Sequence, residues 1–420
     1  MTEHPLIQRF IRYTNVGDRS SLAPYQQRHC PLSLCAALMC FFLPPAWGAE
    51  PMAIDILYLW QAEDRPPTLA NREPPPEDAG RAGAELGVAD SNTTGRFTGQ
   101  TYKLTTQQVS SPEQAAETVA TWFAEGSGLV VADLPDDSLQ AASQQLPTDQ
   151  SGIIINATNR NDHWRHRSCR GGLLHTAASH AMLVDGLGQF FIARRWRDWF
   201  IVQGPRPADT AWSQAFKRTA KRYGAKIRDE KTWSFETDLR RTAQAELPLF
   251  TQGNDYDVVL VADDLGDVGD FISYNTWLPR PVAGTQGLVP TEWSPVIEQW
   301  GALQLQNRFE ALAGRGMTAD DYSAWAGVRS IAEAVTRTGD ADPAALYAYM
   351  LSDNFELAGF KGRGLTFRPW NGQMRQPITL VQPRAVVSQS PQEGFLHPRT
   401  DMDTLGYDAA EANCSFKENR

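Results

Sequence analysis

The chain has few cysteines and no excess of basic residues. Five of its 420 residues are cysteine, and its formal net charge is −10. Because nucleic-acid phosphates attract Lys and Arg, this acidic balance argues against nucleic acid as the main partner. An acidic surface suits a soluble protein whose copies repel one another, and we expect a monomer.

Short motifs of common enzymes are also missing. The chain has no G-x-S-x-G nucleophile elbow, no Walker A sequence and no G-x-G-x-x-G after a predicted strand. Four histidines between residues 163 and 180 could suggest a metal site. Four arginines between residues 160 and 170 would repel a cation there. We therefore interpret this stretch as a solvated basic loop, with a site for an anionic ligand group as the alternative, and expect no catalytic residue, no cofactor and no metal.

The apolar run at residues 31–43 is too short to span a bilayer as a permanent helix. Arg28 precedes it, and prolines and small residues follow, which is the pattern of a secretory signal peptide. We expect residues 1–48 to be removed after Ala46-Trp47-Gly48, and the protein to reach the periplasm. The stretch before Arg28 is long, so the true start codon could lie further in. A lipoprotein signal is the alternative, but neither Cys35 nor Cys40 follows a small residue.

Only Cys169 and Cys414 remain once residues 1–48 are removed. Two cysteines in an exported protein suggest one disulfide. The polar tail around Cys414 has little else to hold it in place, which favours the bridge. Two separate buried thiols are the alternative.

Predicted strands and helices alternate along the first part of the chain. We expect strands at residues 54–60, 102–109, 128–132 and 152–156, and helices at residues 79–88, 112–123 and 136–144. Ser111 is expected to cap the second of these helices. Strands such as IDILYLW and GIIIN are nearly continuous apolar runs. Such runs are typical of a parallel sheet covered on both faces.

The same pattern repeats from residue 172 to residue 283. Strands are predicted at residues 172–175, 199–203, 225–229 and 258–262, and helices at residues 179–193, 208–223 and 238–245. Amphipathic helices are expected at residues 300–313, 320–338 and 343–351. Residues 367–373 and 378–387 are predicted to form a hairpin that turns near Asn371-Gly372. The polar residues from 389 onward are expected to wrap the surface.

Two late stretches are similar to a known family. Residues 321–325 (DYSAW), which lead into residues 332–334 (AEA), resemble its late helix. Residues 360–367 (FKGRGLTF), followed by Asn371-Gly372, resemble its Phe/Gly-rich ending. The family is the branched-chain amino-acid/amide-binding group of type I periplasmic binding proteins, which serve ABC transporters. The resemblance covers nearly all of the chain after residue 48.

This resemblance implies an α/β fold of two doubly wound parallel-sheet lobes joined by a three-stranded hinge. By resemblance, lobe one comprises residues 49–170 and 284–350, and lobe two comprises residues 171–283 and 351–390. Residues 391–420 form a tail. A small ligand would lie between the lobes and be passed to an ABC transporter permease, and the protein would not be an enzyme.

A narrower resemblance rests on four longer strings. Residues 280–293 (RPVAGTQGLVPTEW), 299–315 (QWGALQLQNRFEALAGR), 367–378 (FRPWNGQMRQPI) and 390–397 (SPQEGFLH) look like the subfamily associated with PQQ-dependent alcohol dehydrogenase systems. The resemblance implies a link to alcohol oxidation and leaves the ligand open.

Candidate ligand residues follow the predicted strands, because open parallel sheets bind small molecules at the carboxyl ends of their strands. On lobe one they are Trp60, Gln61, Asp133, Leu134, Asn156, Ala157 and Thr158. On lobe two they are His175, Thr176, Gln203, Gly204, Asp263 and Asp264. Each also has a structural interpretation: the tryptophan could pack at a rim, the two aspartates could cap the next helix, and the asparagine could serve loop backbone.

The resemblance also bears on the class of ligand. Amino-acid binders of the family present Ser and Thr from lobe one and Tyr and an acid from lobe two. Thr158 lies at one such position, but Leu134-Pro135 and Pro205-Arg206 stand where the Ser and the Tyr are expected. A ligand less polar than a zwitterionic amino acid is therefore implied.

Two other functions stay open from the sequence. One is a sensor or scaffold of the alcohol-oxidation system that docks on a partner without transport. The other is a metal-assisted hydrolase that would use His175 with Asp263 and Asp264.

Overall fold

The computed structural model describes residues 52–62, 74–233 and 239–414. The predicted signal peptide at residues 1–48, with its cleavage site after Gly48, lies outside the described residues. No helix in the described ranges is long and apolar enough to cross a membrane.

The first sheet has five parallel strands in the order β2-β1-β3-β4-β5. The strands are β1 (Met52–Gln61), β2 (Gln100–Val109), β3 (Leu129–Asp133), β4 (Ile153–Asn156) and β5 (Leu173–His175). Strand β1 is buried on both faces, because Ile54 and Ile56 belong to one core cluster while Leu57 and Leu59 belong to another. This explains why the strand is a continuous apolar run rather than an alternating one.

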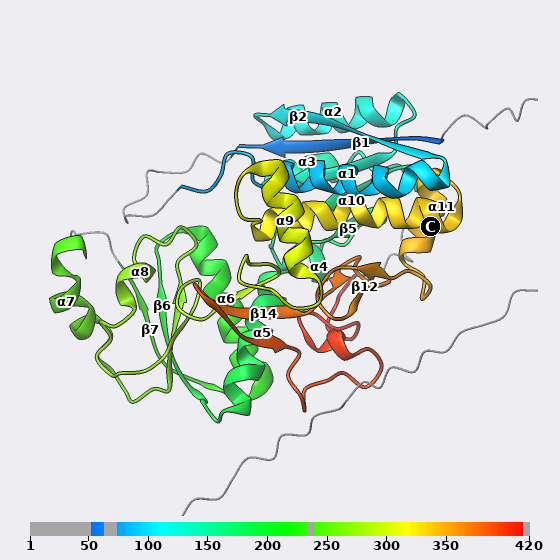
Figure 1. Ribbon diagram of the computed structural model, residues 1–420. Coiled ribbons are helices and arrows are strands. Elements are labelled where there is room, and N and C mark those ends of the chain that lie inside the picture. Colours follow the sequence, from blue (N-terminus) through cyan, green and yellow to red (C-terminus); the bar gives the residue numbers. More distant parts are fainter. Residues whose placement is uncertain (1–51, 63–73, 234–238, 415–420) are drawn as a thin grey trace, which may run out of the picture. The chain divides into compact units, whose positions relative to one another are not determined.

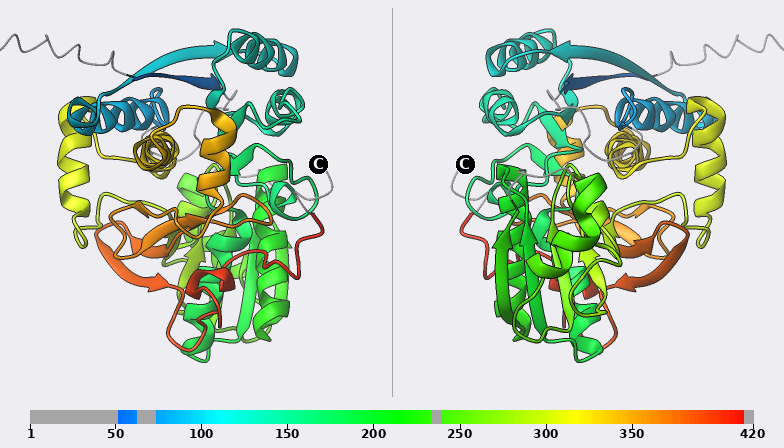
Figure 2. Two further views of the ribbon diagram at one scale, coloured as in Figure 1. Left: turned by 90° about the vertical axis from the view of Figure 1, so that its right-hand side faces the viewer. Right: turned by 90° about the vertical axis from the view of Figure 1, so that its left-hand side faces the viewer.

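Helices cover both faces of this sheet (Figures 1 and 2). Helices α1 (Arg81–Thr98) and α10 (Ala319–Thr338) pack on one face. Helices α2 (Pro112–Ala124) and α3 (Asp136–Ser143) pack on the other. The first pair is so close that a Cβ on Gly83 would lie 1.9 Å from the backbone oxygen of Asp321. The glycine is therefore required by the helix–helix contact.

The second sheet has four parallel strands in the order β7-β6-β8-β9. They are β6 (Asp198–Gln203), β7 (Lys226–Thr232), β8 (Val258–Ala262) and β9 (Val282–Gly284). Helices α5 (His180–Ala193) and α6 (Pro207–Tyr223) contribute to the core on one face, and α7 (Leu239–Phe250) and α8 (Gly269–Ile272) to the core on the other. The α/β architecture expected from the sequence is thereby confirmed.

Helix ends follow the signals in the sequence. The hydroxyl of Ser111 accepts a hydrogen bond from the backbone N–H of Gln114 at the start of α2. The hydroxyl of Ser179 does the same for Met182 at the start of α5. Gly224 ends α6 in the left-handed conformation, with φ of 72°, which a residue with a Cβ adopts only at a cost.

Each sheet and the helices that cover it form one α/β layer. The remaining elements connect the two layers. The late helices are α9 (Ala302–Ala313) and α11 (Pro343–Met350). Strands β10 (Val289–Thr291), β14 (Ile378–Gln382) and β15 (Ala385–Ser390) form an antiparallel sheet. Strands β11 (Leu357–Ala358), β12 (Gly364–Phe367) and β13 (Met374–Arg375) form another. Two short helical turns, α4 (His163–His166) and a 3-10 turn at Asp401–Thr404, complete the described elements.

Three features of pairing and packing differ from the expectations, and α1 continues ten residues beyond residue 88, where its helix was expected to end. The strand predicted at residues 172–175 was expected to open the second α/β unit, but β5 pairs with β4 in the first sheet. The expected hairpin is two hairpins: Asn371-Gly372 turns between β12 and β13, whereas β14 pairs with β15. Strands β11 to β13 pack in the first core cluster, although the lobe boundaries from the sequence place them in lobe two. Strands of two to four residues carry too little pattern to reveal their partners.

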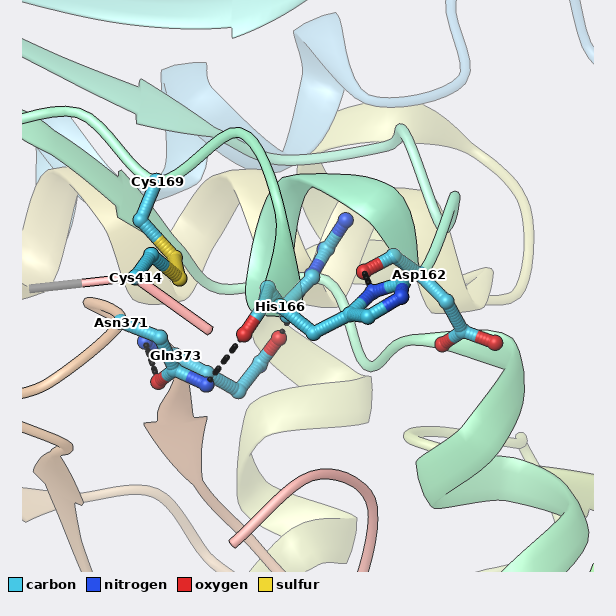
Figure 3. Close-up of a disulfide and its surroundings, with 7 residues drawn as sticks. Asp162, His166, Cys169, Asn371, Gln373 and Cys414 are labelled. Atoms are coloured by element: carbon cyan, nitrogen blue, oxygen red, sulfur yellow. Dashed lines mark hydrogen bonds between the residues drawn. A yellow bond between two sulfur atoms is a disulfide. The ribbon is translucent and has the colours of Figure 1, made fainter. Parts of the chain in front are cut away.

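Cys169 and Cys414 form a disulfide, with their Cα atoms 5.6 Å apart (Figure 3). Nearby, the backbone N–H of Asn413 donates to the backbone oxygen of His166 at 2.9 Å. Further back along the tail, the backbone N–H of Gly406 donates to Asp185 of α5 at 2.8 Å. The C-terminal segment is therefore joined to the loop before β5 by the bridge and to α5 by hydrogen bonds.

Loss of this bridge should destabilise the protein, because the bridge closes a loop of 245 residues in the unfolded chain. We expect Cys414→Ser to lower the free energy of unfolding by about 2–5 kcal/mol, measured by urea denaturation followed by tryptophan fluorescence. The matched control is the double variant Cys169→Ser/Cys414→Ser, whose transition should not respond to reductant. Equal midpoints for the oxidised and reduced wild-type protein would contradict the expectation.

Candidate functional site

Hydrogen-bonded polar side chains lie together at the carboxyl ends of the strands of the first sheet. The hydroxyl of Tyr58 donates to one carboxylate oxygen of Asp133 at 3.0 Å, and the hydroxyl of Thr158 donates to the other at 2.7 Å. Tyr58 lies within β1, Asp133 ends β3, and Thr158 follows β4. Burial, and then the neighbouring carboxylate of Asp133, raise the pKa of Tyr58 well above its usual value. The phenol therefore stays protonated and holds Asp133 in place.

Arg160, in the loop after β4, is held between acidic groups. Its guanidinium donates to Glu292 and, at 2.8 Å, to Asp320. Burial lowers the pKa of Arg160, but Glu292, Asp320 and Asp264 outweigh burial and raise it overall. We call Asp133, Thr158, Arg160, Asp264, Glu292 and Asp320 the strand-end cluster. It holds four carboxylates and one guanidinium, so its charges favour a neutral or cationic group over a carboxylate.

On the second sheet, two adjacent aspartates have different roles. The Asp263 side chain accepts hydrogen bonds from the backbone N–H groups of three residues, Asp267, Val268 and Gly269, at 2.7–3.2 Å. It is 2 % exposed and stabilises the start of α8. Asp264 is exposed and accepts a hydrogen bond from the indole N–H of Trp212 at 3.2 Å. Asp263 thus has the role that the helix-capping interpretation gave it, whereas the side chain of Asp264 faces solvent.

The other residues predicted from the first sheet are largely engaged within the chain. Asn156 is buried and contacts the ring of His175 at 3.0 Å. The hydroxyl of Thr176, also buried, lies 3.4 Å from the backbone oxygen of Asn156. Trp60 is half-buried against the first core, with the guanidinium of Arg81 6.0 Å from its ring.

Gln61 and Gln203 lie at equivalent places at the ends of β1 and β6. The side chain of Gln61 accepts a hydrogen bond from the hydroxyl of Ser138 at 2.5 Å, and that of Gln203 donates to Thr210 at 3.1 Å. Ala157, Leu134 and Gly204 are buried. The structure therefore brings the predicted residues to the expected edges of the sheets, where intramolecular contacts engage most of their polar groups.

A hollow of about 240 Å³ lies beside these edges, and we call it the lateral hollow. One side is formed within residues 161–167, which include α4. The other side is formed by Ala211, Gln214, Ala215 and Arg218 of α6, and His180 and Tyr407 complete the lining. Trp164 of α4 belongs to a core of the first sheet, whereas α6 belongs to a core of the second. The lateral hollow therefore lies between elements of the two layers.

His180, the first residue of α5, is the least satisfied polar group of this lining. Its side chain is 91 % buried, and its Nδ1 has no hydrogen-bond partner among the described residues. The ring lies edge-on to Trp212 at 5.0 Å between centroids. Burial, followed by the charges of Arg160 and Arg165, lowers the pKa of His180 to about 3. A nitrogen of a neutral imidazole that lacks a partner can donate one hydrogen bond to an uncharged polar group or accept one from it.

The metal-hydrolase alternative required His175, Asp263 and Asp264 to act together. Within the described ranges, no group of three or more His, Cys, Asp or Glu residues is arranged to hold a metal ion. The ring of His175 contacts Asn156, and Asp263 caps α8. These contacts assign structural roles to two of the three residues.

A larger groove, of about 530 Å³, lies elsewhere on the first layer. Its lining comes from β2 and α2, through exposed groups such as Gln107, Gln108, Gln114 and Glu117. All of these belong to one layer, so no residue of the second layer lines this groove. We therefore place the candidate site at the lateral hollow and the strand-end cluster.

Sequence reasoning missed His180, Trp212, Glu292 and Asp320 as parts of this site. His180 was weighed only as a metal ligand within a group of histidines. The signal that could have found it is its position directly after Ser179, the cap of α5, because a residue there lies where the chain leaves the first sheet. Glu292 follows a three-residue strand, and nothing in its local pattern distinguishes it from a surface acid.

The roles of Asp263 and Asp264 can be separated by stability measurements. We expect Asp263→Ala to lower the free energy of unfolding by about 1–3 kcal/mol, because three backbone N–H groups lose their acceptor. The matched control, Asp264→Ala, should change it by less than about 1 kcal/mol, since that side chain is exposed. Urea denaturation of both variants tests this, and equal losses would show that Asp263 is not a cap.

His180 should make stability fall in mild acid. The unfolded chain binds a proton near pH 6.5, whereas the folded ring resists it down to about pH 3. Protons therefore favour unfolding, and this contribution grows as the pH falls below about 6.5. Between pH 7.5 and pH 5, the advantage of the wild type over His180→Phe should shrink by about 2 kcal/mol.

The control for this experiment is His397→Gln, in the C-terminal segment outside the lateral hollow. Its difference from the wild type should not follow the same curve. A constant difference between wild type and His180→Phe over this pH range would mean that the ring is hydrated or partnered.

The fold matches those of known binding proteins. A family model described as a periplasmic binding protein matches residues 75–274. A periplasmic binding protein from Burkholderia mallei is 15% identical with a TM-score of 0.63, over 87% of this chain and 99% of that chain. A branched chain amino acid ABC transporter periplasmic ligand-binding protein from Burkholderia xenovorans LB400 is 15% identical with a TM-score of 0.67, over 87% and 100%.

A third structure is a solute binding protein of an ABC transporter from R. palustris in complex with benzoate. It is 14% identical with a TM-score of 0.59, over 81% of this chain and 98% of that chain. The comparison with curated protein sequences finds no match. The chain has the fold of the type I periplasmic binding proteins, and just under half of its residues match the model of that family.

Proposed function

We propose that the protein is a periplasmic solute-binding protein that captures a small ligand between its two layers and presents it to an ABC transporter permease. It carries out no chemistry on the ligand. The observation that supports this most directly is the lateral hollow, because it lies between α4 of one layer and α6 of the other and contains an unpartnered buried imidazole. The structural relatives named as ABC transporter ligand-binding and solute-binding proteins support the same function.

We further propose two lobes that follow the packing. Lobe one contains the first sheet, α9, α10, α11 and β11 to β13, and lobe two contains α5, α6, the second sheet, β14 and β15. The chain then passes between lobes after β5, between β9 and α9, and between β13 and β14. The three passages form the hinge, and movement about them would admit and enclose the ligand.

The ligand is proposed to be small and uncharged, with at least one hydroxyl or carbonyl oxygen. The hollow, at about 240 Å³, lies below the usual range of roughly 300–1,000 Å³ for sites that hold drug-sized ligands. The carboxylates of the strand-end cluster disfavour an anion, Arg218 in the lining of the hollow is already paired with Asp185 and Glu411, and His180 is neutral. An alcohol or aldehyde meets these conditions and fits the link to PQQ-dependent alcohol oxidation that the sequence resemblance implies.

Individual ligand contacts are also proposed. His180 and Gln214 line the lateral hollow, while Thr158 and Asp264 lie in the strand-end cluster with side chains that are not fully buried. We assign these four, and the guanidinium of Arg160 in the same strand-end cluster, to ligand contact. Trp60, Gln61 and Gln203 would shape the rim. Asn156, His175, Thr176 and Asp263 would act through the loops that they hold.

A panel of compounds tests the function through thermal unfolding of residues 49–420. We expect short alcohols or aldehydes to raise the melting temperature, while amino acids and the matching carboxylic acids leave it unchanged. A ligand at about one hundred times its dissociation constant adds about 2.7 kcal/mol to the stability of the folded state. His180→Phe should abolish the shift, because it removes the imidazole that we assign to the ligand.

The matched control is Gln107→Ala, in the groove on β2 and α2, which should keep the full shift. A shift lost in Gln107→Ala but kept in His180→Phe would move the site to that groove. Binding of an amino acid with micromolar affinity would overturn the proposed ligand class, and no shift with any compound would favour the sensor or scaffold function.

A further inference from the structure

Polar side chains connect the three passages between the layers. The first passage follows β5, the second contains Glu292, and the third contains Gln376 and Pro377. Glu292 accepts a hydrogen bond from the backbone N–H of Ala178 in the first passage at 2.8 Å. The amide of Gln376 donates to the backbone oxygen of Thr176, also in the first passage, at 2.7 Å. The first passage is therefore joined to each of the other two.

Glu292 belongs both to this network and to the strand-end cluster. Its Oε1 accepts from Arg160 as well as from the backbone N–H of Ala178. The side chain is 1 % exposed, whereas that of Arg160 is 19 % exposed. One buried oxygen thus serves both a side chain that reaches the candidate site and the backbone of a passage. Water cannot easily replace the guanidinium there, so the two contacts depend on each other.

A second buried cation holds the third passage. The ammonium of Lys361 is buried and donates to Gln376 at 2.6 Å and to the backbone oxygen of Pro377 at 3.2 Å, in the third passage. It lies 4.6 Å from the ring centre of Tyr322 on α10. Burial lowers the pKa of Lys361 to about 7, and the charge of Glu292 opposes that change.

We propose that Glu292 is the positioning residue that couples Arg160 at the ligand site to the three passages of the hinge. The proposal deepens the proposed function and rests on it. When Arg160 keeps both acidic partners, Glu292 holds the first passage through Ala178, and Gln376 joins the first passage to the third. A ligand oxygen that accepts from Arg160 shifts the guanidinium and changes this arrangement. Ligand contact thereby selects one hinge geometry over another.

The experiment measures the hinge directly, without any ligand. Spin labels on Thr94→Cys in α1 and Lys221→Cys in α6 report the distance between the layers, since both side chains are exposed. We expect Glu292→Gln to broaden this distance distribution, because the amide keeps an acceptor for Ala178 but loses the charge that holds Arg160. Glu298→Gln, an exposed acid six residues on, is the matched control and should leave the distribution unchanged.

Two further readouts separate positioning from general stabilisation. Arg160→Gln should broaden the distribution in the same way, and the double variant Arg160→Gln/Glu292→Gln should broaden it little more than either single variant.

In the wild type the distance distribution should change with a midpoint near pH 7 as Lys361 loses its proton. Glu292→Gln should move that midpoint to lower pH, because it removes the carboxylate that stabilises the ammonium.

The proposal is overturned if Glu292→Gln and Glu298→Gln give the same distribution and pH midpoint, or if the effects of Arg160→Gln and Glu292→Gln simply add. If Glu292→Gln does not fold, Arg160→Gln alone decides, since an unchanged distribution in that variant excludes the coupling. These outcomes are independent of the thermal panel. A panel without any ligand therefore counts against the proposed function, whereas uncoupled hinge distances count against the role of Glu292.

Discussion

Everything in this structure depends on the rule that a buried parallel sheet must be covered on both faces. Parallel neighbours cannot be joined by a tight turn, so each strand is followed by a connection that crosses a face of the sheet. The two faces of β1 show the result: Ile54 and Ile56 belong to one core, and Leu57 and Leu59 to another. Because all strands of a sheet run in the same direction, all carboxyl ends meet at one edge. The polar loops of each layer are therefore concentrated where a ligand can be bound.

The loops at the strand ends need hydrogen-bond partners for their own backbone, and this need competes with ligand binding for the same polar side chains. A loop at a strand end brings backbone N–H and C=O groups that need partners when buried. The nearest polar side chains supply them: Asp263 holds the first N–H groups of α8, and Asn156 bonds to the backbone of Asn159. Side chains left over from this demand are the ones that can meet a ligand. His180, with its unpartnered Nδ1, is such a group in the part of the chain that the structure describes.

The sequence predicts the layers far better than it predicts the site. Apolar runs such as residues 54–60 and 258–262 are long enough to identify buried strands, and Ser111 and Gly224 mark helix ends through local chemistry. Strand β5 was assigned to the wrong sheet because three residues do not show which neighbour they pair with. Asp263 and Asp264 illustrate the limit for the site. They are identical and adjacent, yet one is buried as a cap and the other is exposed, and only the course of the backbone decides which is which.

A hinge made of paired buried charges behaves differently from one made of apolar contacts. Apolar contacts tolerate sliding, because their energy depends on buried area and hardly on direction. The buried carboxylate of Glu292 between the guanidinium of Arg160 and the backbone N–H of Ala178 tolerates few positions, since leaving either donor without its acceptor is costly in a medium with little water. Such a network contributes little net stability, yet it restricts the passages to a small number of geometries. That restriction is what a binding protein needs, because a ligand of modest affinity can then shift the balance between two defined states.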